Sequence, residues 1–225
     1  MPERQPGASR TAACGGLGVS DDAIQHPGLN LGRSHGRDHE AAEALMFGFW
    51  IFLMSDAILF GMAFATYLTS VNATAGGPGP RALYDIQSVF IETLLLLASS
   101  FTFGMASLAL KYQHGTARLI GWLALTLVLG VAFLGLELHD FASMFAQGGG
   151  PTRSGFLSAF FGLVPLHGLH VLGGGIWLIC LIGQLATYGV DRQAKLGIMR
   201  LALYWHFLDI VWIAIFSVVY LAGLA

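Results

Sequence analysis

Apolar residues along this chain gather in five long stretches that short polar segments separate. Lipid offers the backbone no hydrogen bonds, so each stretch that enters it must be helical. Each is also long enough for a helix that crosses a hydrocarbon layer of about 30 Å. The pattern predicts an all-α membrane protein, a bundle of five transmembrane helices. The predicted spans are about 46–69, 87–110, 119–144, 156–186 and 201–224.

The segment before the first span has a different character. It is rich in Gly, Arg, His and Asp, and it lacks the continuous apolar core that a secretory signal needs. We therefore expect residues 1–44 to form a disordered tail that stays in the mature protein. Residues 45–225 form the five-helix transmembrane domain.

Lysine and arginine fall mostly on one side of the predicted membrane. Nine lie in the tail, in the loop between spans two and three, and in the loop between spans four and five, against two elsewhere. Cytoplasmic loops carry such an excess. The distribution predicts that the N-terminus and the tail lie in the cytoplasm and that the C-terminus lies outside, on the other side of the membrane. The nine are Arg4, Arg10, Arg33, Arg37, Lys111, Arg118, Arg192, Lys195 and Arg200, and the two are Arg81 and Arg153.

Composition removes several classes of function. Hydrophobic residues make up 55% of the chain and charged residues 11%, whereas soluble domains carry about 25% charged residues. A net charge of −2 without a basic run argues against nucleic-acid binding. No phosphate loop, nucleophile elbow or Cys-x-x-Cys pair is present, so we expect no soluble small-molecule substrate on this chain.

Nine ionisable side chains nevertheless lie inside the predicted spans. Intramembrane groups of this kind are costly and mark functional sites by default. Each must pair with a partner, face water, meet another subunit or stay protonated. They are Asp56, Glu92, Glu137, Asp140 and Asp209, with His139, His167, His170 and His206.

Their spacing argues against a metal site. His139 and His206 should lie roughly 20 Å apart along the membrane normal, whereas ligands lie about 2 Å from one ion. A di-iron bundle needs Glu-x-x-His, but Glu137 is followed by Asp140 at that spacing. We therefore expect no metal, and His167 and His170 bonded to neighbouring helices.

Some of these groups carry a specific expectation. Asp56 has no histidine within a helical turn, so it needs a partner on another helix, with His206 or His170 the nearest by depth. Glu92 lies near the start of span two, where the helix dipole favours an anion. Arg153 opens span four, and there it is an interfacial anchor or headgroup contact.

His206 and Asp209 lie three residues apart and share one helix face. Spacing alone leaves two readings open. The pair is either a proton-relay or lipid-headgroup site, or a self-satisfied polar pair that fixes the helix in place.

Four segments together resemble a known family. "FGFWIFLMSDAILF", "RSGFLSAFF", "HGLHV" and "YWHFLDIVW" resemble subunit III of the haem-copper terminal oxidases. They occur in the family's order, and the resemblance covers roughly 46–224. The nearest branch is the bacterial bo-type ubiquinol oxidases, because subunit III of cytochrome c oxidase usually has seven spans.

This resemblance implies a non-redox accessory subunit of a proton-pumping ubiquinol oxidase in a bacterial inner membrane. Haem and copper belong to subunit I, and this chain is itself non-catalytic and holds no cofactor besides phospholipid. Its partners are subunits I, II and IV. It supports assembly, lipid binding and sustained proton uptake.

The resemblance also implies roles for single residues. Asp56 matches an intramembrane carboxylate, a carbodiimide-reactive glutamate in many cytochrome c oxidases, which aspartate shortens. Glu137 and Asp140 match an acidic pair. His206 and Asp209 are expected to satisfy each other and the neighbouring helices, and His167 and His170 match the motif before them.

Three alternatives remain. One is subunit III of a cytochrome c oxidase. A second is a freestanding transporter that uses Asp56 and the histidines for proton coupling, against which an odd number of spans without evident halves weighs. A third is a metalloenzyme with its own iron site.

Overall fold

The computed structural model describes residues 35–75, 86–112 and 115–222, and these residues are helical apart from turns and short connections. Five helices are long and apolar enough to cross a membrane, which confirms the predicted five-helix transmembrane protein. They are α1 (His35–Ser70), α3 (Ile86–Lys111), α4 (Thr116–Ala146), α5 (Gly155–Tyr188) and α6 (Arg192–Ile215), and the π-helical segment η2 (Phe216–Leu221) continues α6.

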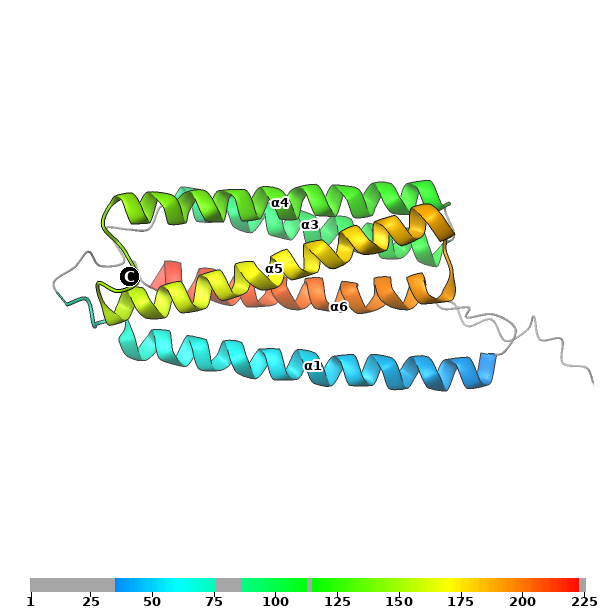
Figure 1. Cartoon of the computed structure of the whole chain (residues 1–225), viewed down its shortest axis with the longest axis horizontal. Helices are drawn as coiled ribbons and strands as arrows, with labels where there is room; N and C mark the ends of the chain where they lie inside the picture. Colours follow the sequence, from blue (N-terminus) through cyan, green and yellow to red (C-terminus); the bar gives the residue numbers. More distant parts are fainter. Residues whose placement is uncertain (1–34, 76–85, 113–114, 223–225) are drawn as a thin grey trace, which may run out of the picture.

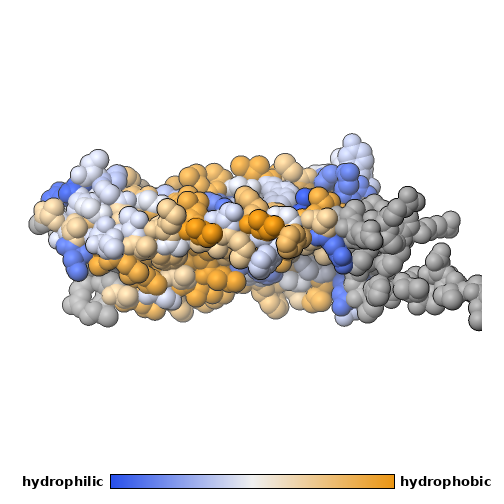
Figure 2. All heavy atoms as spheres, turned by 90° about the horizontal axis from the view of Figure 1, so that it is seen from below, coloured by the Kyte–Doolittle hydropathy of each residue, from blue (hydrophilic) through white to orange (hydrophobic). Residues whose placement is uncertain are grey.

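The helices run up and down along one long axis (Figure 1). Helix α6 packs against α5, α3 and α1, while α3 and α5 both pack against α4. Helix α5 runs obliquely across the bundle and continues through Pro165 without ending. Side chains in the middle of the molecule are mostly apolar, and hydrophilic ones gather toward both ends (Figure 2). This distribution is the one expected of a protein whose middle lies in hydrocarbon and whose ends lie at the membrane surfaces.

Two helices begin earlier than the apolar pattern suggested. Helix α1 starts at His35, so residues 35–44 are helical where we expected the tail to continue; residues 1–34 lie outside the described residues. Helix α6 starts at Arg192 instead of near 201, because the Asp191 side chain accepts a hydrogen bond from the Ala194 N–H at 2.7 Å and caps it. Apolar stretches mark where a helix meets lipid, and a helix can extend beyond them.

The early start of α6 adds a polar first part to the helix. The candidate span covers Gln193–Leu221, and Lys195 and Arg200 precede its apolar part. His206 lies six residues beyond Arg200, about 9 Å by helical rise. His206 and Asp209 therefore lie in the apolar part, where unpaired polar groups are costly.

Two tryptophans of α6 connect it to α3. The indole N–H of Trp205 donates to Ser99 Oγ at 3.0 Å, and that of Trp212 donates to Thr93 Oγ1 at 3.0 Å. Both indoles are buried. Lipid tails are as apolar as the helices, so packing and such interhelical hydrogen bonds hold a membrane bundle together.

Glycines on two other helices make room for the Trp205 ring. A Cβ added at Gly130 of α4 would lie 3.0 Å from Trp205 Cη2, and one at Gly174 of α5 would lie 3.0 Å from Tyr204 Cε1 and 3.3 Å from Trp205 Cζ3. Trp205 is thus the side chain at which α3, α4, α5 and α6 meet.

Candidate functional site

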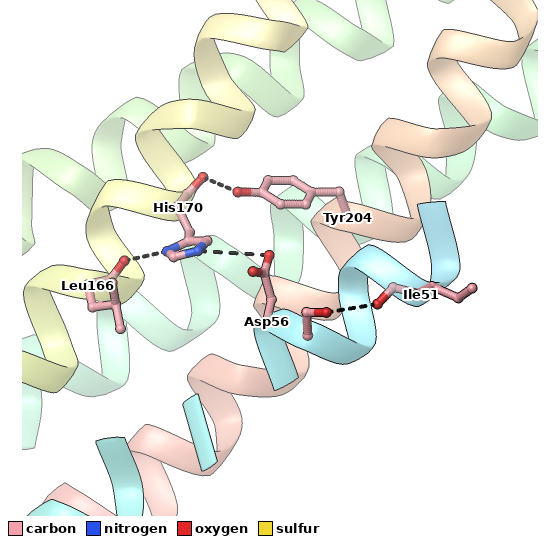
Figure 3. A network of polar contacts seen from close by, with 6 residues as sticks. Ile51, Asp56, Leu166, His170 and Tyr204 are labelled. Carbon is pink, nitrogen blue, oxygen red and sulfur yellow. Dashed lines mark hydrogen bonds and ion pairs between the residues drawn. The ribbon is translucent and has the colours of Figure 1, made fainter. Parts of the chain in front are cut away.

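The first polar group joins α1 to α5 near the middle of the membrane. Asp56 Oδ2 lies 3.9 Å from His170 Nε2, and the two side chains are 12% and 18% exposed. Figure 3 shows the carboxyl group and the imidazole facing each other. The partner that Asp56 required is therefore His170, and His206 is bonded elsewhere.

One ring nitrogen of His170 is bonded to its own helix. Its Nδ1 lies 2.7 Å from the Leu166 backbone oxygen, and a carbonyl can only accept, so Nδ1 carries a hydrogen. The other nitrogen, Nε2, faces Asp56 at 3.9 Å, within reach of electrostatic attraction but beyond a direct hydrogen bond.

Two aromatic residues hold this pair in place. The Tyr204 hydroxyl on α6 donates to the His170 backbone oxygen at 3.0 Å (Figure 3). The Phe60 ring on α1 lies 5.0 Å from the His170 ring, centroid to centroid. Three helices therefore converge on a partly enclosed polar pair, an arrangement suited to locking α1 onto α5 and α6.

The second group lies between α3 and α6. His206 Nδ1 is 2.8 Å from Ser100 Oγ, and the same serine hydroxyl interacts with the Asp209 carboxyl. His206 and Asp209 form no ion pair with each other among the described residues. They interact electrostatically, and a serine on the neighbouring helix α3 contacts both.

Glu92 lies in the second turn of its helix. Helix α3 starts at Ile86, one residue before the predicted start, and has no acidic residue in its first turn. The dipole acts mainly within the first turn, so its contribution at Glu92 is small. The side chain is 1% exposed.

Glu137 on α4 is buried in the same half of the bundle. It lies against Gly168 of α5, where an added Cβ would come 2.7 Å from Oε2, so the carboxyl group would have to move to accommodate any other residue. Oε1 of Glu92 and Oε1 of Glu137 are buried and lack hydrogen-bond partners within the described part of the chain. Electrostatic interactions link Glu92 to Glu137 and Asp140, so the three carboxyl groups form one cluster.

His167 is fully buried in an aromatic surrounding. Its Nε2 lies 3.2 Å from the Leu208 backbone oxygen on α6, and the rings of Phe133 and Trp212 lie 5.9 Å and 5.2 Å from it. His167 thus bonds a neighbouring helix, while the Nδ1 bond of His170 is to its own helix. Both rings are positioned by packing between helices.

Arg153 lies in the connection between α4 and α5, at the end of the bundle nearer to the three carboxyl groups. It is exposed, and its Nη1 donates to the Gly148 backbone oxygen at 3.4 Å. Ser154 caps α5 by accepting a hydrogen bond from the Leu157 N–H. Within the described residues, no group of three or more His, Cys, Asp or Glu side chains could hold a metal ion.

The sequence reasoning overlooked the hydroxyl residues of α3. Thr93 and Ser100 stand seven residues apart and therefore share a helix face. That face meets α6, where Thr93 accepts from Trp212, Ser99 from Trp205, and Ser100 contacts His206. Their spacing was a signal available in the sequence, but only the packing identified the partners.

Known proteins resemble this chain over most of its length. The family model described as cytochrome c oxidase subunit III matches residues 31–224. A cytochrome bo(3) ubiquinol oxidase subunit 3 from Pseudomonas aeruginosa is 45% identical over 86% of this chain and 92% of its own length. The protein of that name from Buchnera aphidicola is 42% identical over 80% of this chain and 92% of its own.

A third relative carries a shorter name, without the bo(3) designation. The quinol oxidase subunit 3 of Bacillus subtilis is 41% identical over 82% of this chain and 90% of its own length. The residues that the family model matches, 31–224, include all five helices that could span a membrane. The chain belongs to the cytochrome c oxidase subunit III family.

Proposed function

We propose that this chain is subunit III of a proton-pumping ubiquinol oxidase, a haem-copper complex that reduces oxygen to water in the aerobic respiratory chain. The observation that carries the proposal is 45% identity to a bo(3) ubiquinol oxidase subunit 3 across 92% of that protein. In this reading the chain is a non-catalytic subunit. Its partners are subunits I, II and IV, and haem and copper reside in subunit I.

The polar groups within the bundle support a bracing role. Asp56 with His170, and Ser100 with His206, each join two helices, and His167 bonds the α6 backbone. Such contacts fix one arrangement of helices at mid-membrane, against which subunit I can assemble. Sustained proton uptake by subunit I then depends on this chain through the stability of the assembled complex.

The experiment is purification of the tagged chain in mild detergent, followed by absorption spectra and oxygen-consumption assays. Haem absorbance should accompany the chain, and the complex should oxidise ubiquinol and not reduced cytochrome c. Oxidation of cytochrome c instead would place the chain in the other branch of the family. Purification without haem would overturn the proposal.

Lipid binding has a specific candidate location. A groove of about 280 Å³ lies where α1, α5 and α6 meet, with Leu45, Trp177, Gln184 and Arg200 among its lining residues. Arginine beside apolar and tryptophan side chains suits a phospholipid whose phosphate lies at the membrane surface. We place an anionic phospholipid headgroup beside Arg200, with its acyl chains along α1 and α5.

Lipid phosphorus in the purified complex tests this placement. Arg200→Gln should lower the phosphorus content relative to the wild type. Arg118→Gln is the matched control, because Arg118 is an exposed arginine on α4 at the same end of the bundle and does not line the groove. Equal phosphorus content in the two variants would show that no phospholipid binds in this groove.

The charge distribution supports a cytoplasmic N-terminus in a bacterial inner membrane. Lys111, Arg118, Lys195 and Arg200 lie at the end of the bundle where α1 begins, and Arg153 lies at the other. The excess of basic residues marks the cytoplasmic side. The variant Thr152→Cys, which places a thiol in the connection between α4 and α5, should therefore react when a reagent that cannot cross membranes is added to whole spheroplasts.

A further inference from the structure

The side of α6 between α1 and α3 carries an exposed stripe that is apolar except for His206. Leu203, Ile210 and Ile213 lie at helical spacing on either side of it, and all are exposed. Both α1 and α3 pack against α6, and they leave this strip of its surface uncovered. Apolar positions on it suit lipid, but His206 does not.

The depth of His206 makes its exposure costly. It lies six residues beyond Arg200, which we place at the headgroup level, and so about 9 Å into the membrane by helical rise. Hydrocarbon at that depth offers no hydrogen bonds. An exposed imidazole there therefore requires a polar partner that lipid tails do not supply.

Hydrogen bonding to α3 leaves one imidazole nitrogen available. The Ser100 Oγ and His206 Nδ1 atoms are 2.8 Å apart, so Nδ1 is engaged with α3. The other ring nitrogen, Nε2, donates or accepts a hydrogen bond according to the tautomer. No hydrogen bond to this nitrogen is present among the described residues.

We propose that the α6 stripe around His206 is a docking surface for a membrane-spanning helix of another subunit of the complex, which presents a hydrogen-bonding side chain to His206 Nε2. The occupant is a helix because only a helix satisfies its own backbone within the hydrocarbon. It presents an amide or hydroxyl group, which can donate or accept, and small or aliphatic residues opposite Leu203, Ile210 and Ile213. The proposal rests on the proposed function in requiring that the chain be part of a complex.

Photo-crosslinking in native membranes tests the location. Benzoylphenylalanine at Ile210, which is 67% exposed, should join this chain to another subunit of the oxidase on irradiation. A product that contains only this chain and lipid, a quinone or a second copy of this chain would overturn the proposal. The haem spectrum of the unirradiated complex is recorded in parallel, so failure of the proposed function is recognised separately.

Substitution of His206 tests the hydrogen bond. His206→Leu should lower the yield of the crosslinked product and the co-purified subunits by about 3- to 30-fold, the range for one interhelical hydrogen bond in a membrane. His206→Gln, which keeps a side chain that can donate or accept a hydrogen bond, should restore most of that yield. Thr66→Val is the control, because Thr66 is an exposed hydroxyl on α1 that bonds only its own helix, to the Met62 oxygen at 2.9 Å.

The amount of this chain in the membrane separates docking from folding. His206→Leu should leave it unchanged while the crosslinked product falls. Two outcomes would show that the imidazole is not a docking contact. In the first, His206→Leu, His206→Gln and Thr66→Val all retain the full amount of crosslinked product. In the second, His206→Leu lowers the amount of the chain and of the product together, and His206→Gln restores neither.

Discussion

Two adjacent glycines of α5 allow the packing around Trp205 to be measured. A Cβ at Gly173 would meet no other atom within 4 Å, whereas one at Gly174 would lie 3.0 Å from Tyr204 Cε1 and 3.3 Å from Trp205 Cζ3. Gly173→Ala and Gly174→Ala therefore share the same helix and chemistry. They differ only in what the added methyl group contacts.

The two rings have little freedom to move away. The Tyr204 hydroxyl is bonded to the His170 oxygen at 3.0 Å, and the Trp205 N–H to Ser99 Oγ at 3.0 Å. To reach ordinary contact the rings must shift by a few tenths of an ångström, which strains both hydrogen bonds. Overpacking of this kind costs about 1–3 kcal/mol.

Helix propensity acts equally on both variants. Alanine is favoured over glycine in a helix by about 1 kcal/mol. Gly173→Ala should therefore be neutral or stabilised, and Gly174→Ala should be less stable than Gly173→Ala by about 1–3 kcal/mol. The free energy of unfolding is measured on the purified chain in mixed micelles with increasing dodecyl sulfate.

A second substitution checks the cause. Tyr204→Leu removes the ring that the new methyl group meets first, so the cost of Gly174→Ala should shrink in that background. Equal stability of Gly173→Ala and Gly174→Ala would refute the packing argument. An undiminished cost after Tyr204→Leu would place the strain elsewhere.

Three further predictions concern the polar groups and a helix cap. Asp209→Leu should lower the yield of assembled complex more than turnover per assembled complex, and normal yield with collapsed turnover would show a catalytic role instead. His170→Leu, which leaves Asp56 buried without its partner, should destabilise the chain more than the double change with Asp56→Leu does; the opposite order in micelle unfolding contradicts the pairing. Ser154→Ala should cost about 1 kcal/mol in the same assay, because the Leu157 N–H loses its acceptor, and an unchanged midpoint would mean that the cap contributes nothing.

Parts of the candidate site were predictable because depth along a helix can be counted. Asp56 and His170 both fall near mid-span, which narrowed the partner of Asp56 to two histidines. The start of α6 at Arg192 was not predicted, because the apolar edge near 201 shows where the helix meets lipid and not where its capping residue Asp191 lies.

The sequence by itself determined the solvent, the number of spans and the family. These follow from the length and composition of the apolar stretches, because a hydrocarbon layer imposes the same requirement on every chain that crosses it. Tertiary structure decided which polar groups meet. Ser100 joins His206 to Asp209, and Gly174 admits Tyr204 and Trp205, because helix rotation and crossing depend on close packing between side chains far apart in the chain.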